Sequence, residues 1–145
     1  MFSSPFAASR STAMNAYHRT ALEVRAAQAD PHQLVSMLFD GFFEAVSMAR
    51  GALRSGDVAA RGRAIGRAVS IVDEGLRAAL DLEAGGPLAR DLHDLYSYVT
   101  MRLTRANLSS DEAGLQECME LLQPLAEAWA ADRPQAVATH PRAGA

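Results

Sequence analysis

The sequence contains no lysine, a single cysteine, few aromatic residues and no long apolar run, and its charge balance, cysteine count and apolar pattern exclude several classes of protein. All 14 basic residues are arginine and are outnumbered by 17 acidic ones, so a net charge of −3 offers no basic footprint for nucleic acid. Cys118 cannot form an internal disulfide, which fits a reducing compartment. No run approaches the roughly 20 apolar residues that span a bilayer, and the first ten residues lack the apolar core of a secretory signal. We therefore expect a cytoplasmic protein without nucleic-acid binding or stable membrane insertion.

The alternation of apolar and polar residues that marks a β-strand is also missing, whereas helical periodicity covers most of the chain. The pattern predicts an all-α fold, an antiparallel up-down four-helix bundle with an N-terminal arm or short extra helix. We expect one domain over 14–131, preceded by a disordered N-terminus at 1–13 and followed by a disordered tail at 132–145. Its predicted parts are an arm at 14–29 and helices at about 31–54, 57–83, 87–107 and 110–131.

The chain is organised around the first of these helices, whose start the sequence predicts in detail. Asp30 suits the N-cap, Pro31 the first helical position, and Gln33 the return arm of a capping box. Two apolar stripes follow at helical spacing. One runs through Leu38 and Phe42, and the other through Val35, Phe39, Phe43 and Val46. A bundle helix normally needs one stripe. The second predicts contact with a flap of the chain, another helix or a partner, unless the core is simply overfull.

The breaks between the helices carry local signals of their own. Gly56 suits the left-handed end of the first helix and Asp57 the cap of the second. Ser109 and Glu112 are spaced as a capping box for the fourth helix. Pro124 lies inside that helix, where it removes a hydrogen bond and should kink it.

No residue pattern favours an enzyme. A di-iron bundle requires inward Glu-x-x-His pairs, which the sequence lacks, so we expect no metal and no cofactor. Cys118 lies between glutamates that raise a thiol pKa, which favours a core residue. His93, the one mid-helix histidine, allows an alternative function as a histidine phosphotransfer-like bundle. Asp91 and Asp94 flank it and would repel a phosphoryl group, so an ordinary surface histidine is the competing interpretation.

Five blocks of sequence resemble the FliS family of flagellar secretion chaperones. DPHQLVSMLFDG at 30–41 is similar to the family's Ser/Asp-Pro-x-x-Leu-x-x-Met-Leu-Tyr-Asp-Gly, and LYSYVTMRLTRAN at 95–107 to its Leu-Tyr-Asp-Tyr-x-x-Arg-Arg-Leu-x-x-Ala-Asn. IVDEGL at 71–76 resembles the family's second helix, and Ala128-Trp129 its closing Ala-Trp. MNAY at 14–17 resembles the opening Asn-x-Tyr. The blocks occur in the family's order and spacing.

The resemblance implies a cytosolic export chaperone that binds the disordered C-terminal segment of flagellin. It would prevent premature polymerisation and assist delivery to the flagellar type III export apparatus, with the export gate and other flagellar regulators as further candidate partners. The family's N-terminal arm covers part of the binding surface when no client is bound. This implies a self-capping arm made of Tyr17, Leu22 and Val24, with Tyr17 as a removable plug or an ordinary packed aromatic.

The same resemblance, with the apolar surplus, selects candidate contact residues for the client. They are Leu38, Phe39, Phe42, Ile71, Tyr96, Val99, Arg102, Leu103 and Asn107. The first three are either core or groove wall. Arg102 pairs with a client carboxylate, or equally with Asp94 or Glu112. Gly41 allows a close approach by a neighbour or by the client, and Trp129 is expected in the core; with Asp30 and Pro31, these two form the structural set.

Overall fold

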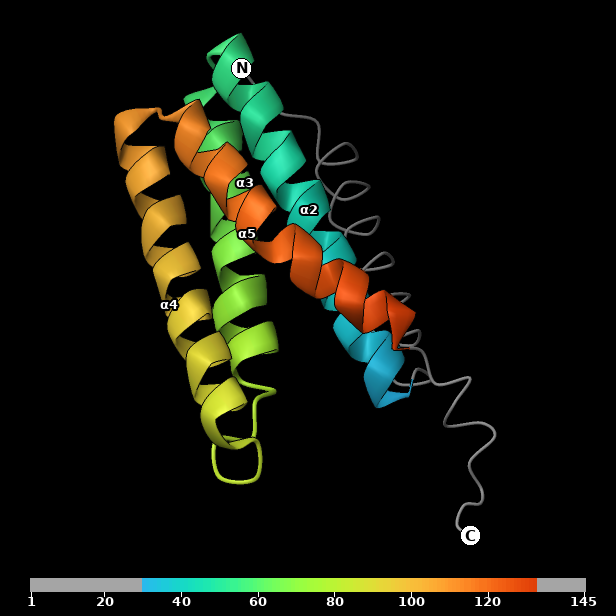
Figure 1. Ribbon diagram of the computed structural model, residues 1–145. Helices are drawn as coiled ribbons and strands as arrows, with labels where there is room; N and C mark the ends of the chain where they lie inside the picture. Colours follow the sequence, from blue (N-terminus) through green and yellow to red (C-terminus); the bar gives the residue numbers. More distant parts are fainter. Residues whose placement is uncertain (1–29, 133–145) are drawn as a thin grey trace, which may run out of the picture. The chain divides into compact units, whose positions relative to one another are not determined.

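A computed structural model describes residues 30–132, and every element in this range is helical (Figure 1). The elements are α2 (Pro31–Ser55), α3 (Val58–Ser70), the π-helix η1 (Ile71–Arg77), α4 (Gly86–Ser109) and α5 (Glu112–Ala131). The expected arm with Tyr17, Leu22 and Val24, the disordered N-terminus and nearly all of the expected tail lie outside the described residues. The chain divides into two units between Leu34 and Val35, so the packing described below begins at Val35.

The start of α2 forms the expected capping box. The backbone N–H of Gln33 donates to Asp30 Oδ1 over 2.7 Å, and the Asp30 N–H donates to Gln33 Oε1 over 3.3 Å. Two N–H groups that the first helical turn leaves without partners are thereby satisfied.

The turn from α2 to α3 follows its sequence signals. Gly56 has a φ of 77°, and the N–H of Asp57 donates to the Ala52 carbonyl over 2.9 Å, which closes α2 with a Schellman-type end. Asp57 then accepts from the N–H of Ala60 over 3.0 Å as the N-cap of α3. One pair of residues therefore ends one helix and begins the next.

The second predicted helix is shorter than expected and changes type. Regular α-helix stops at Ser70, a π-helix continues to Arg77, and the exposed segment 78–85 then leads to α4, although the sequence predicted a helix through 83. A π-helix closes hydrogen bonds from residue i to i+5 and is rare. Apolar periodicity does not separate the two types over so short a segment.

The turn from α4 to α5 uses residues other than the expected ones. Ser110 adopts the left-handed conformation with a φ of 52°, and Asp111, rather than Ser109, caps α5 by accepting from the Ala113 N–H over 3.0 Å. Glu112 takes no part in a capping box and binds two arginines of α2 instead. Pro124 lies inside α5, which continues through it to Ala131.

The helices pack as the expected antiparallel four-helix bundle around one core. α4 contacts α5, α3 and η1. The fully enclosed side chains come from every α-helix and from η1. The largest are Phe42, Val46, Val72, Val99, Leu103, Leu115, Cys118 and Leu122. None of the helices between residues 30 and 132 is both long and apolar enough to cross a membrane.

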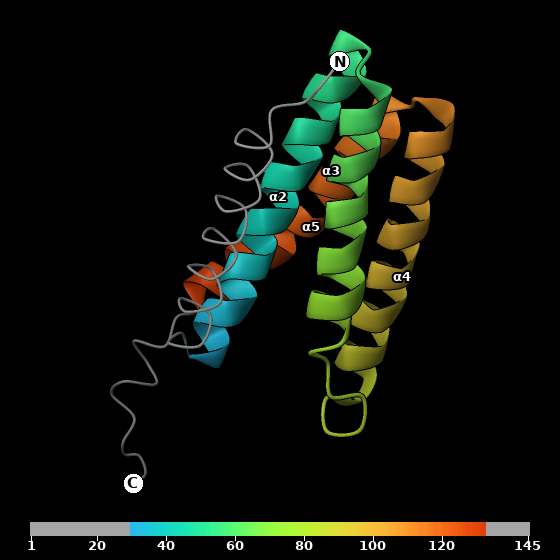
Figure 2. The same cartoon turned by 180° about the vertical axis from the view of Figure 1, so that it is seen from behind.

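The two ends of the bundle differ in how far the helices separate. At one end, here called the polar end, α2 and α4 finish and α3 and α5 begin. At the other, the loop end, α4 begins, η1 and α5 finish, and the part of α2 that starts at Val35 begins. α2 and α5 diverge from the α3–α4 pair toward the loop end, in the view from the front and in that from behind (Figures 1 and 2).

Glycine replacements test this assignment of backbone conformations. A Cβ at Gly66, inside α3, would meet nothing within 4 Å. Gly66→Ala should therefore raise the free energy of unfolding by about 1 kcal/mol through helix propensity alone. Gly56→Ala should lower it by about 1 kcal/mol, because an L-residue resists a positive φ. Urea unfolding followed by circular dichroism measures both, and two changes of the same sign would contradict the assignment.

Candidate functional site

The polar end is fastened by arginines, of which Arg102 makes the most enclosed connection. From α4 its Nη2 lies 3.0 Å from Asp111 Oδ2 and its Nε 2.8 Å from Glu117 Oε1. The guanidinium lies across Gly114 of α5, where a Cβ would overlap its atoms. Tyr98 adds a hydrogen bond of 2.6 Å to Glu117. Gly114 therefore provides the space in which α4 and α5 are joined by charge.

The charges in this cluster shift one another's ionisation. The hydrogen bond from Tyr98, followed by the Arg102 guanidinium, lowers the pKa of Glu117, and Arg102 lowers the pKa of Asp111. The same bond to Glu117 raises the pKa of the Tyr98 phenol. Both carboxylates thus stay ionised further into acid than free side chains would.

Three further arginines join α2 to α5 and α3 to α4 at the polar end. Arg50 of α2 donates to Glu112 at 3.0 Å and also to Gln116, and Arg54 binds the same carboxylate. Arg61 of α3 donates to Asn107 twice, to its side-chain oxygen and its carbonyl, at 3.0 Å each. The second of these bonds satisfies a carbonyl in the last turn of α4, where positive charge is favourable.

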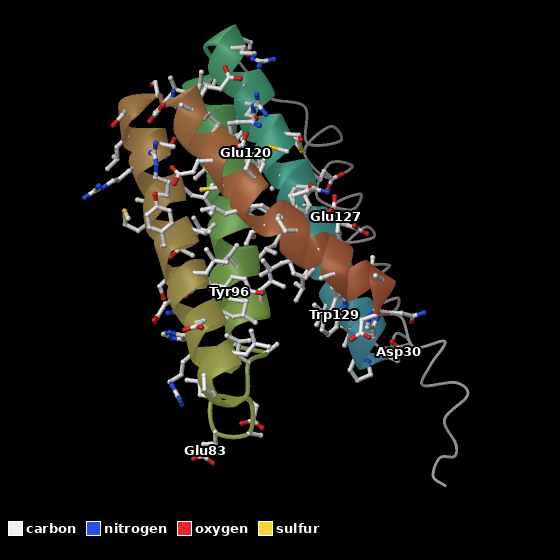
Figure 3. The ribbon with its side chains drawn as sticks, in the orientation of Figure 1. Asp30, Glu83, Tyr96, Glu120, Glu127 and Trp129 are labelled. Atoms are coloured by element: carbon white, nitrogen blue, oxygen red, sulfur yellow. The ribbon has the colours of Figure 1, made fainter. Side chains whose placement is uncertain are left out.

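The loop end carries apolar side chains that are only half-buried. They pack against the enclosed core but remain partly open to solvent. We call six of them, from η1 and three helices, the apolar rim: Leu38, Ile71, Leu92, Leu95, Leu125 and Trp129. Trp129 marks the end of α5 at this end of the bundle, and Tyr96 lies on the inner side of α4 (Figure 3). Half-buried aliphatic and aromatic groups on several elements suit a partner that supplies apolar side chains of its own.

The structure places the predicted contact residues in three settings. Leu38 and Ile71 belong to the apolar rim. Five others are core side chains at most 5 % exposed: Phe39, Phe42, Tyr96, Val99 and Leu103. Arg102 and Asn107 bind within the chain at the polar end, and Arg102 pairs with Asp111 and Glu117 rather than with Asp94 or Glu112. The nine predicted residues therefore do not form one continuous surface.

The sequence did not identify three residues of the apolar rim as contact residues, but it did predict that Gly41 allows a close approach. Leu92, Leu95 and Leu125 were not among the predicted contact residues, because periodicity alone does not distinguish a core position from its edge. Gly41 does allow a close approach, since a Cβ there would lie 3.1 Å from Ile71 Cδ1. Trp129 is half-buried and packs against the core.

The residues considered for chemistry have ordinary surroundings. Burial raises the pKa of the Cys118 thiol to about 12, and its Sγ lies 3.8 Å from the Val99 carbonyl. His93 Nδ1 lies 3.6 Å from an Asp94 carboxylate oxygen. The negative charge of that carboxylate would repel a phosphoryl group on His93. Within the described helices no group of three or more His, Cys, Asp or Glu side chains could hold a metal ion.

Replacing Arg102 tests the charge cluster through its pH dependence. Asp111 and Glu117 have folded-state pKa values below their ordinary 3.8 and 4.5. Their stabilisation is therefore complete at neutral pH and is lost as pH falls through the folded values. Arg102→Gln should be less stable at neutral pH and lose less stability on acidification. Urea midpoints across pH measure this, with Arg105→Gln as the matched control. Parallel profiles for wild type and Arg102→Gln would contradict the prediction.

Comparison with known proteins identifies the family to which this helical bundle belongs. Residues 13–136, which include every described helix, match the family described as flagellar protein FliS. The flagellar secretion chaperone FliS of Salmonella typhimurium is 44% identical over 123 residues, which are 85% of this chain and 91% of that protein. FliSB of Pseudomonas aeruginosa is 39% identical over 117 residues (81% and 92%), and FliS of Escherichia coli 35% over 114 residues (79% and 84%). These proteins are named as chaperones rather than enzymes. The chain belongs to the FliS family of flagellar secretion chaperones.

Proposed function

We propose that this protein is a cytosolic export chaperone that binds the disordered C-terminal segment of flagellin. In this role it prevents premature polymerisation and assists delivery of the subunit to the flagellar type III export apparatus. The observation that carries the proposal is the family match, which extends over the whole described bundle. The export gate and other flagellar regulators are further proposed partners.

The apolar rim is the proposed docking surface for the client. A disordered segment that orders on binding loses roughly 2–5 kcal/mol of the gross interaction energy. Complete burial of one leucine side chain stabilises a complex by about 1.5–3 kcal/mol. Several half-buried apolar side chains are therefore needed to offset the free energy lost when the client segment orders. The rim supplies them on η1, α2, α4 and α5. A short amphipathic helix of the client could place its apolar face across them.

Titration calorimetry with a C-terminal flagellin peptide from the same organism tests the proposal. We expect a one-to-one complex with a negative heat-capacity change, because apolar surface is buried and the peptide orders. Absence of binding at high micromolar concentrations, with the bundle shown to be folded by circular dichroism, would overturn the proposed function.

Substitutions on the rim test the docking surface separately. Leu95→Ser should weaken the peptide complex about tenfold, since a loss of about 1.4 kcal/mol changes the dissociation constant by that factor. Leu108→Ser is the matched control on the same helix, because Leu108 is 80% exposed and lies at the polar end. Equal weakening by both substitutions would exclude the rim as the docking surface. The control also reveals any general effect of removing a surface leucine.

A further inference from the structure

The contact between α2 and η1 rests on two reciprocal glycine positions. A Cβ at Gly75 of η1 would lie 2.8 Å from Cδ2 of Leu38 on α2. A Cβ at Gly41 of α2 would lie 3.1 Å from Cδ1 of Ile71 on η1. Each helix thus places an aliphatic side chain on the bare backbone of the other. We call this pair of contacts the glycine lock.

The glycine lock is the apolar counterpart of the arginine contacts at the polar end. From Val35 onward, α2 makes no hydrogen bond or ion pair with η1 among the described residues, and its polar contacts lie further along the helix, at Glu44, Arg50 and Arg54. Shape complementarity alone therefore joins α2 to η1. Dispersion contacts of this kind weaken steeply when the two surfaces separate slightly.

On the other side of the lock lies η1, a π-helix of seven residues. η1 has π-helical hydrogen bonding, a geometry that is rare and usually needs tertiary support. It is followed by the exposed segment 78–85, which can absorb a displacement because none of its side chains is fully buried. The core side chains behind the lock include Phe39 and Phe42, which are 5% and 0% exposed.

From these observations we propose that the bundle opens at the loop end by release of the glycine lock, while the arginine contacts keep the polar end closed. In the opened form α2 moves away from η1, and Phe39 and Phe42 become accessible. If the proposed function holds, a client segment binds the opened form and contacts Phe39 and Phe42 there. This last step alone rests on the proposed function.

Hydrogen exchange on the full-length protein tests the opening without any ligand. Gly75→Ala places a methyl group 2.8 Å from Leu38 Cδ2, so that the Leu38 side chain must shift, and should speed amide exchange about threefold in 35–42 and 71–77. Exchange at the polar end should change less than twofold. Gly66→Ala is the matched control, because its Cβ meets nothing within 4 Å. Leu38→Ala alone, which removes the side chain that packs on Gly75, should also speed exchange in 35–42 and 71–77.

The native thiol separates local opening from global unfolding. Cys118 is fully enclosed and is the one cysteine of the chain, so its labelling rate reports loss of the central core. We expect labelling of Gly75→Ala within twofold of wild type at the concentrations used for exchange. Labelling that rises in parallel with exchange would overturn the proposal, as would faster exchange spread over all helices or no difference from Gly66→Ala.

The flagellin peptide then tests the coupling to binding. Gly75→Ala should bind the peptide several-fold more tightly than wild type, because a larger fraction of the variant is already in the opened form that binds. Equal affinity would show that the peptide does not select the opened form. A peptide that binds neither protein would overturn the proposed function and leave the opening itself to be decided by exchange and labelling.

Discussion

The side-chain contacts of Arg50, Arg61 and Arg102 join the helices at the polar end of this bundle. Each joins two helices near the turns at Gly56 and Ser110. Because the guanidinium is a planar fork with several donors, one side chain satisfies two acceptors at once, as Arg102 does with Asp111 and Glu117. A lysine ammonium, with its compact charge, would not reproduce that geometry. The choice of arginine therefore has a structural consequence here, whatever the origin of the lysine-free composition.

The polar end of the bundle is joined by arginine contacts, whereas the loop end is joined mainly by apolar packing. The core continues to the loop end, where Leu38, Ile71 and Trp129 pack against it but are only half-buried. Proteins open most readily where few buried contacts and weak hydrogen bonding coincide. The exposed segment 78–85 has few buried contacts, whereas η1 combines its π-helical hydrogen bonding with Val72 and Leu76 in the core. A stable topology and an accessible apolar surface thus coexist in a chain of 145 residues.

The parts of the structure that were predictable from sequence are those determined by neighbouring residues. The capping box of Asp30 and the Gly56–Asp57 turn depend on local backbone chemistry, and the four amphipathic helices depend on a period visible in the sequence. The partners of Arg102 were not predictable, because they depend on how α5 lies on α4. The π-helix was missed since its apolar spacing also fits an α-helix. For the same reason, Val99 could not be assigned to the core rather than to a contact surface.

The separation of the two ends also has a consequence for how such a protein diversifies. Rim residues outside the glycine lock, such as Leu92, Leu95 and Leu125, can change in size and shape without disturbing Glu112, Glu117 or the turns that set helix order, because they lie toward the opposite end of the helices. Substitutions at sites this far apart usually add in their effects on stability. A lineage could therefore refit its rim to a changed client in small independent steps, each of which leaves the fold intact.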